Sequence, residues 1–470
     1  MMRMARAGVF LLVFAGPAMA GAPAADPAAQ WPQWRGPDGT GVGQATHIPD
    51  EWSVTRNVKW KVPVDGLGHS TPIIWGDRVF LLTAIDTKVK GTPAVVPTPS
   101  PQRGDGRPQG RGRGPGGFRG RGGGGRSFHG GSTPTTVHKF AVLCLDRKTG
   151  RRLWERTAVD EVPHEGHHGR FGSFASGSPA TDGTHVYANF GSRGLYCYDM
   201  DGNLQWKKDL DKMSTAMAFG EGVSPVVYGD SLVVQHDHQG QSYITVLDKS
   251  TGNTRWKADR DDPTTWATPT VVDVNGRPQV VAAGTPMIRA YDLATGEERW
   301  RCSGMTRNAI PTLVAGHGMV YATSGFRGNA LRAIRLGNTG DLTDDANAIA
   351  WSLDRGTPYV PSPLLYGDEL YLLRDRGMVS CYDAKTGKPH YEETRIPGVS
   401  RVQFHASPVG AGGKIYCLSL DGTCVVLKRG KTLEVVAINK IDERFSASPA
   451  VAAGDLFLRS DKHLYCIGTN

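Results

Sequence analysis

The chain has 470 residues, of which 39% are hydrophobic and 21% charged, with 61 Gly and 30 Pro. This composition suits a large core interrupted by many turns. Eight of its nine excess positive charges come from the first 20 residues and from residues 101–126, so the rest of the chain is nearly neutral. That distribution gives no support for a basic partner-binding face over the folded body as a whole.

The first 20 residues have the pattern of a secretion signal. Arg3 and Arg6 precede a short apolar run at 9–15, and Ala18-Met19-Ala20 is a typical cleavage site. The run is shorter than the roughly 20 residues that span a bilayer. No Cys follows the cleavage point directly, as a lipid-anchored protein would need, and no later stretch is apolar enough to cross a membrane. We therefore expect a periplasmic or secreted protein, with residues 21–56 as an N-terminal extension.

A Pro preceded by Ser, Thr or, once, Ile recurs along the rest of the chain. It stands at positions 72, 179, 225, 269, 311, 363, 408 and 449, and after the first interval the copies lie 41–52 residues apart. This period is typical of one four-stranded propeller blade. The sequence therefore predicts an all-β fold over residues 57–470, an eight-bladed β-propeller of four-stranded antiparallel blades.

Three copies contain an apolar-Asp pair, then a Thr-Gly turn, then Trp, as in Asp146 to Trp154 and Asp292 to Trp300, and others keep part of this run. A lone four-stranded sheet cannot bury both faces, so neighbouring blades must stack. One Trp ring buries about 150–250 Å² and suits such a seam. We assign the following residues to the seams between blades: Trp60, Trp154, Trp206, Trp256 and Trp300. Tyr391 takes this place in a later copy, and an insertion precedes Trp351.

The last copy, from Ser448 to Gly468, has no fourth strand of its own. An alternating apolar and polar segment, residues 57–62, precedes the first copy and carries Trp60. We expect this N-terminal strand to complete the eighth blade. Closure of the ring would remove the exposed edges of an open sheet.

The Asp-x-x-Thr-Gly-x-x-x-Trp runs resemble the tryptophan-docking repeats of the PQQ-like β-propeller family, over roughly residues 57–470. The opening Trp31-Pro32-Gln33-Trp34-Arg35-Gly36-Pro37 also resembles the start of exported members of undefined role. The superfamily includes quinoprotein alcohol dehydrogenases and an outer-membrane assembly lipoprotein. The resemblance implies the fold but leaves both kinds of function open, because one fold hosts many functions.

Residues 86–137 interrupt the first copy between its second and third strands. They are rich in Gly, Pro and Arg and have few apolar residues, so we expect disorder. The Arg-Gly runs resemble RNA-binding segments, with Phe118 and Phe128 as stacking partners. An exported chain meets little RNA, so we expect no nucleic-acid partner. Anionic envelope polymers are the alternative partner, and a solvated segment without a specific partner is the simplest interpretation.

The linkers that begin each copy should meet at one mouth of the ring. The positions three and four before each Pro gather polar and aromatic side chains there, which suits a ligand-binding rim. A ring of eight linkers gathers some polar residues in any case, which is the competing interpretation. The candidate ligand-binding residues are His69, Glu221, Trp266, Arg307, Asn308, Tyr359 and His405.

A PQQ-dependent dehydrogenase acting on alcohols or sugars is the enzymatic alternative that the resemblance implies. It would need PQQ on the axis, Ca²⁺ held by oxygen ligands and an Asp base. The vicinal Cys pair of those enzymes is absent, and only Glu221 and Asn308 suggest a calcium set. We assign no catalytic residue and no cofactor; PQQ with Ca²⁺ belongs to the alternative alone.

Two further clusters contain potential metal ligands. Glu165-Gly166-His167-His168 lies in a Gly-rich loop, and His236 and His238 share a strand face, but the sequence supplies no third ligand. We therefore assign no metal site. Most of the seven Cys stand at core positions of the repeat, whereas Cys417 and Cys424 flank a turn and leave a disulfide open.

Together these features predict a monomeric, non-catalytic binding or scaffolding module of the cell envelope. Its partner would be a protein or an envelope polymer.

Overall fold

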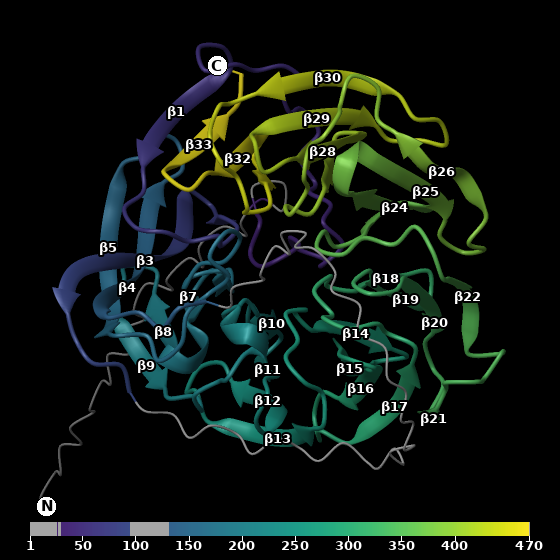
Figure 1. Cartoon of the computed structure of the whole chain (residues 1–470), viewed down its shortest axis with the longest axis horizontal. Helices are drawn as coiled ribbons and strands as arrows, with labels where there is room; N and C mark the ends of the chain where they lie inside the picture. The colour runs from purple at the N-terminus through teal and green to yellow at the C-terminus, as the bar shows by residue number, and fades with distance from the viewer. Residues whose placement is uncertain (1–25, 27–29, 95–130, 470) are drawn as a thin grey trace, which may run out of the picture.

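The computed structural model describes residues 26, 30–94 and 131–469. These residues form eight sheets around one axis, each a blade of a closed propeller (Figure 1). The predicted all-β, eight-bladed architecture is confirmed. The only helical segments in the described part are the short 3₁₀ turns η2 (Gly191–Arg193), η3 (Ala216–Ala218) and η4 (Asp375–Gly377). Within these ranges no helix is long and apolar enough to cross a membrane.

Each blade is an antiparallel meander whose first strand lies at the axis, except that the eighth takes its outermost strand from the N-terminal part of the chain. From the axis outward the first four blades are β2 (Ile73–Trp75), β3 (Arg78–Lys90), β4 (Thr136–Asp146) and β5 (Arg152–Glu161); β6 (Ala180–Thr181), β7 (His185–Asn189), β8 (Leu195–Asp199) and β9 (Leu204–Lys208); β10 (Val226–Tyr228), β11 (Ser231–His236), β12 (Ser242–Asp248) and β13 (Thr254–Arg260); and β14 (Thr270–Val274), β15 (Arg277–Ala283), β16 (Met287–Asp292) and β17 (Glu298–Ser303), with β21 (Gly340–Asp341) added in parallel.

The other four blades are β18 (Val314–Gly316), β19 (Met319–Ser324), β20 (Ala330–Arg335) and β22 (Ile349–Leu353); β23 (Leu364–Tyr366), β24 (Glu369–Arg374), β25 (Met378–Asp383) and β26 (Pro389–Arg395); β27 (Val409–Ala411), β28 (Lys414–Leu418), β29 (Thr423–Lys428) and β30 (Val435–Lys440); and β31 (Ala450–Ala452), β32 (Asp455–Arg459), β33 (His463–Ile467) and β1 (Val58–Pro63). Every innermost strand contacts the innermost strands of both neighbouring blades, so the ring is continuous.

Hydroxyl groups at the axis explain the Ser or Thr that accompanies each repeated Pro. Each hydroxyl from the second to the eighth blade accepts a hydrogen bond from the backbone N–H of its counterpart in the preceding blade, at 2.8–3.2 Å. The Thr71 hydroxyl closes the circle by donating to the Ser448 carbonyl at 3.2 Å. We call this circle the hydroxyl girdle; its members are Thr71, Ser178, Ser224, Thr268, Thr312, Ser362, Ser407 and Ser448.

Tryptophan side chains join the outer parts of neighbouring blades. Five indole N–H groups donate to the carbonyl that follows the turn Asp of the next blade, at 2.8–3.1 Å. Each ring also lies so close over the turn Gly that a Cβ there would come within 2.5–2.8 Å of it. The residues that dock in this way are Trp60, Trp154, Trp206, Trp256 and Trp351.

Trp300 packs in one buried cluster with residues of the fourth and fifth blades, but its hydrogen bond differs from that of the other five. Its N–H donates to Gln279 Oε1 of its own blade at 3.1 Å. The connection after β20 contains the extra strand β21, which pairs with β17 at Trp300. β21 therefore lies where the turn of the next blade would otherwise accept the Trp N–H.

The N-terminal strand closes the eighth blade. β1 pairs antiparallel with β33, and Trp60 lies opposite Cys466. Glu443 binds both strands, because it accepts hydrogen bonds from Lys61 Nζ at 3.0 Å and from Tyr465 Oη at 2.6 Å. The predicted closure of the ring by an N-terminal strand is confirmed.

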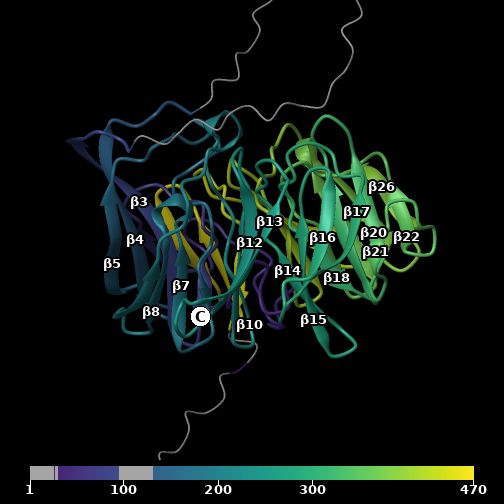
Figure 2. The same cartoon turned by 90° about the horizontal axis from the view of Figure 1, so that it is seen from below.

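The segment before β1 enters the axial channel from one end (Figures 1 and 2). Trp31 pairs with Ile74 of the first blade, and Trp34 Nε1 donates to Thr312 Oγ1 at 2.9 Å. Arg35 is 1% exposed and donates to the carbonyls of Pro408 and Pro363 at 2.8 and 2.7 Å. We call residues 30–43 the axial plug; they tie together blades that are far apart in the sequence.

Strands β3 and β4 extend into the predicted insertion from both sides. Residues 86–90 and 136–137 are strand, so the boundaries 86–137 were too wide. Residues 95–130 lie outside the described residues, as does the predicted signal at 1–20. All seven Cys are buried and free, including Cys417 and Cys424.

Candidate functional site

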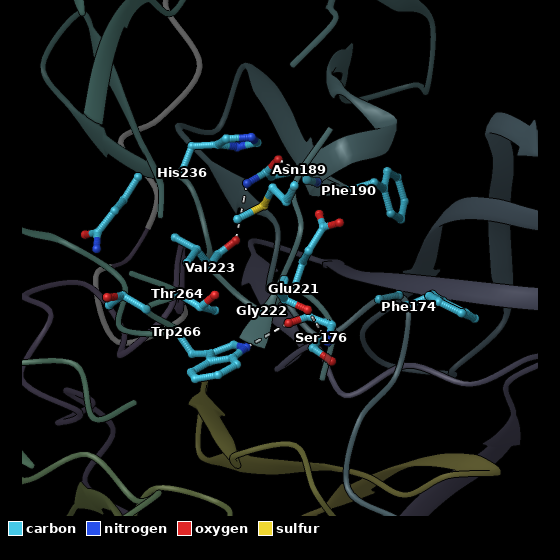
Figure 3. A pocket seen from close by; sticks show the side chains of 18 residues that line it. Phe174, Ser176, Asn189, Phe190, Glu221, Gly222, Val223, His236, Thr264 and Trp266 are labelled. Atoms are coloured by element: carbon cyan, nitrogen blue, oxygen red, sulfur yellow. Dashed lines mark hydrogen bonds between the residues drawn. The ribbon is translucent and has the colours of Figure 1, made fainter. Parts of the chain in front are cut away.

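A small polar cavity lies where the linkers before the second, third and fourth blades meet at the axis (Figure 3). Its volume is about 20 Å³, which is room for one water molecule. Trp266 forms one wall and donates its indole N–H to the Gly220 carbonyl at 2.8 Å. Ser176 and Glu221 line it as well. Two of the seven rim candidates, Trp266 and Glu221, therefore do share one cavity.

Glu221 is held by the second blade. Its Oε1 lies 2.7 Å from Arg193 Nη1, and its Oε2 accepts the Ser192 N–H at 2.6 Å. Burial would raise the pKa of Glu221, but the charge of Arg193 and the Ser192 hydrogen bond outweigh it and hold that pKa below its ordinary value. Arg193 also pairs with Glu161 at 3.3 Å. Glu221 is therefore an ionised carboxylate with a fixed orientation.

His164 and Glu165, in the linker after β5, approach Glu221 closely. One ligand atom of each of the three residues lies within 4.8 Å of the others. His164 Nε2 lies 2.6 Å from the Met213 carbonyl, whereas its Nδ1 is buried without a hydrogen-bond partner in the described structure. Burial lowers the pKa of His164 and raises that of Glu165. The sequence analysis missed His164, for which adjacency to Glu165 was the only signal.

Two His candidates lie elsewhere around the rim. His405 packs on Phe171 with ring centroids 4.5 Å apart, and burial lowers its pKa to about 4. His69 Nε2 lies 3.4 Å from Asp461 Oδ1. The guanidinium of Arg444 lies over the other side of this cluster, 5.5 Å from the Phe171 ring. The loop that carries Phe171 follows β5, so it reaches across the mouth to the linkers of the last blades.

The remaining candidates form a third group, and two of them, Arg307 and Asn308, are out of register. Asn308 Nδ2 lies 3.5 Å from Tyr359 Oη, and Tyr359 stacks on Phe326 at 4.9 Å. Arg307 pairs through its backbone with Phe326. In the other blades the girdle residue precedes the repeated Pro, whereas in the fifth blade the girdle residue is Thr312, which follows Pro311. The rim positions were counted back from Pro, so in this blade they lie two residues before the positions equivalent to those of the other blades. The rim thus contains three separate clusters and no single pocket for all seven candidates among the described residues.

The other histidine pairs are engaged locally. His236 Nε2 lies 2.8 Å from the Asp211 carbonyl, and His238 Nδ1 accepts the Ser214 N–H at 3.1 Å. His168 Nδ1 accepts backbone N–H groups of its own loop at 3.2 Å. These contacts orient the rings toward the backbone and leave little room for a shared ligand.

A larger open groove of about 690 Å³ lies on the same face, between the sixth and seventh blades. Arg376, Arg395 and Arg401 line it together with Asp375, and all three arginines are exposed. Among the described residues none of them forms an ion pair with a side chain, and Asp375 Oδ1 accepts the Phe404 N–H at 2.9 Å. We call this surface the arginine groove.

Comparisons with known proteins agree on the architecture. A family model described as outer membrane protein assembly factor BamB matches residues 138–300 and again 240–469. BamB from Moraxella catarrhalis is similar with a TM-score of 0.52 and 16% identity, over 72% of this chain and 91% of that one.

Two quinoprotein-type structures are similar as well. The quinohemoprotein alcohol dehydrogenase from Comamonas testosteroni has a TM-score of 0.56 and 10% identity, over 95% and 82% of the two chains. A europium-containing methanol dehydrogenase has a TM-score of 0.58 and 11% identity, over 94% and 98%. No curated protein sequence matches the chain. At these identities the structural likeness establishes the fold alone.

Proposed function

The chain belongs to the PQQ-like β-propeller family whose model is described as outer membrane protein assembly factor BamB, and from this premise we propose that it is a non-catalytic binding or scaffolding module of the cell envelope. The family description names an assembly factor, which favours a protein partner over a small substrate. The signal-like pattern of the first 20 residues supports export to the periplasm or beyond.

The filled axis is the observation that carries this proposal. At one end Arg35 and the rest of the axial plug occupy the channel, and at the other the Phe171 loop packs on His405. The cavity left beside Trp266 holds about 20 Å³. Sites for cofactor-sized ligands enclose roughly 300–1,000 Å³, so this small cavity supports a ligand surface outside the axis.

The rim residues also fit PQQ and Ca²⁺ poorly. The two candidates for a calcium set do not lie together: Glu221 lines the small cavity beside Trp266 and pairs with Arg193. Asn308 lies in a different cluster, beside Tyr359. All seven Cys are buried in strands, and no two of them are consecutive in the sequence. These features favour the scaffold over the dehydrogenase.

The arginine groove is the surface that we propose for docking. Three exposed arginines without acidic partners in the described structure suit an acidic segment of a partner protein, because guanidinium groups bind carboxylates through paired hydrogen bonds. A rim charge of this kind steers association and selects partners.

Capture from isolated cell envelopes tests the role. The tagged protein should retain a defined set of envelope proteins, and Arg376→Glu with Arg401→Glu should remove them. Arg277→Glu, at an exposed arginine of the fourth blade, is the matched control and should retain them. Retention of every partner by the double variant would show that the groove is not the docking surface.

A second measurement addresses the enzymatic alternative. The purified chain mixed with PQQ and CaCl₂ should show no saturable quinone binding and no oxidation of alcohols or sugars. Saturable quinone binding with turnover would overturn the non-catalytic proposal.

A further inference from the structure

We propose that His164, Glu165 and Glu221 form a binding site for a divalent transition-metal ion, with Zn²⁺ as its best match. This site joins the linker after the first blade to the linker after the second. It is independent of the proposed docking function and uses neither the arginine groove nor the axial plug.

The geometry of the three donors is the first argument. One imidazole nitrogen and two carboxylate oxygens lie within 4.8 Å of one another, although Glu221 is 56 residues or more away along the chain. Zn²⁺ sites commonly combine three protein ligands of these types with an open position. A small inward movement would bring each atom to the 2.0–2.2 Å or so of such bonds.

The state of His164 is the second argument. Its Nε2 lies 2.6 Å from the Met213 carbonyl, a contact that requires a proton on Nε2. The lone pair is then on Nδ1, which is buried and has no hydrogen-bond partner in the described structure. A metal-binding His typically donates its other N–H to a carbonyl or carboxylate, which orients the ring. The Met213 contact orients His164 in this way, and a cation bound at Nδ1 would satisfy the orphaned nitrogen.

The carboxylates are supported in the same way. Glu165 accepts hydrogen bonds from the Thr215 hydroxyl at 2.6 Å and from its N–H at 3.1 Å. Glu221 is oriented by Arg193 and Ser192. Met213, Thr215 and Glu221 also line the cavity of about 20 Å³, so there is room for a water molecule beside Glu221.

The charge balance permits a dication. Glu161, Glu165 and Glu221 carry three negative charges when ionised, against the positive charges of Arg193 and Lys212, which both pair with Glu161. The cluster thus has an uncompensated negative charge before metal binds. A borderline-soft ion is favoured over Ca²⁺ because one of the three donors is an imidazole nitrogen.

Calorimetry on the metal-free full chain tests the site, with ZnCl₂ as titrant and CaCl₂ for comparison. We expect one equivalent of Zn²⁺ to bind and His164→Ala to weaken its affinity more than the roughly 10–100-fold typical of losing an outer-shell partner. His317→Ala, at a His that pairs with Asp368 on a different blade, should bind like the parent. Circular dichroism checks that both variants fold.

Anomalous diffraction at the zinc edge from crystals grown with one equivalent of ZnCl₂ supplies a readout that does not depend on a variant. A peak between His164, Glu165 and Glu221 is expected. Absence of saturable binding, equal binding by His164→Ala, tighter binding of Ca²⁺ than of Zn²⁺, or a peak at other residues would each overturn the assignment.

Discussion

At the scale of single residues, neighbouring blades of the propeller are joined by contacts between a Trp side chain and a turn Gly. The Trp256 N–H binds the Leu293 carbonyl at 2.8 Å, and a Cβ on Gly296 would come within 2.6 Å of that ring. Gly296 has a φ of 77° and so meets two demands at once, a left-handed backbone and close approach of an aromatic ring.

The fourth blade offers a way to separate these demands. Gly276 has a φ of 76°, but a Cβ on this residue would have nothing within 4 Å of it. We expect Gly276→Ala to cost about 1–2 kcal/mol of unfolding free energy from backbone conformation alone. Gly296→Ala should cost about 1–3 kcal/mol more, because the methyl group displaces the Trp256 ring. Urea denaturation measures both, and equal losses would show that the ring contact contributes nothing.

Strand β1 is the element on which closure depends, and Glu443 makes its attachment sensitive to acid. Burial would raise the pKa of Glu443, but hydrogen bonds from Ser460, Tyr465 and His463 and from Lys61 of β1 lower it to about 2. Because the folded-state pKa lies below the unfolded value of about 4.3, the stabilisation is complete above that pH. It is lost as the pH falls toward 2.

We therefore expect the parent chain to lose about 1–2 kcal/mol more stability between pH 4.5 and 2 than Glu443→Gln, after allowance for solvent screening. The variant should be less stable at pH 7 and should show a flatter acid profile. Glu434→Gln, at an exposed carboxylate of the seventh blade, is the control. If both variants show the same loss of stability with falling pH as the parent chain, Glu443 does not hold β1 to the eighth blade.

The elements also show how far sequence patterns reach. The repeated Pro predicted all eight innermost strands, because the girdle hydroxyl beside it makes a backbone contact that every blade needs. Thr312 fills this place after Pro311 instead of before it. The pattern gave no sign of that shift, so Arg307 and Asn308 were each chosen two positions too early. Trp300 lies between the fourth and fifth blades, but its N–H does not bind the next blade's turn, because β21 arrives from a later part of the chain. His164 could not be found, since its partner Glu221 comes close only in the folded ring.

At the scale of the whole molecule, residues 30–63 have two tasks that can be separated. The axial plug binds the channel through Arg35, whose pKa burial lowers to about 9, while β1 covers the edge of β33. A chain that starts at residue 57 keeps the strand and lacks the plug. It loses the Arg35 hydrogen bonds, each worth about 1.5–3 kcal/mol when a charged group is involved, so its denaturation midpoint should fall.

A chain that starts at residue 64 also leaves β33 with unpaired N–H and C=O groups along its edge. Exposed edges of this kind pair with other chains. We expect the chain from residue 57 to remain a monomer and the chain from residue 64 to associate, as measured by light scattering after size-exclusion chromatography. A monomeric chain from residue 64 with unchanged stability would mean that the other seven blades hold the ring closed, which is incompatible with β1 as the closing strand.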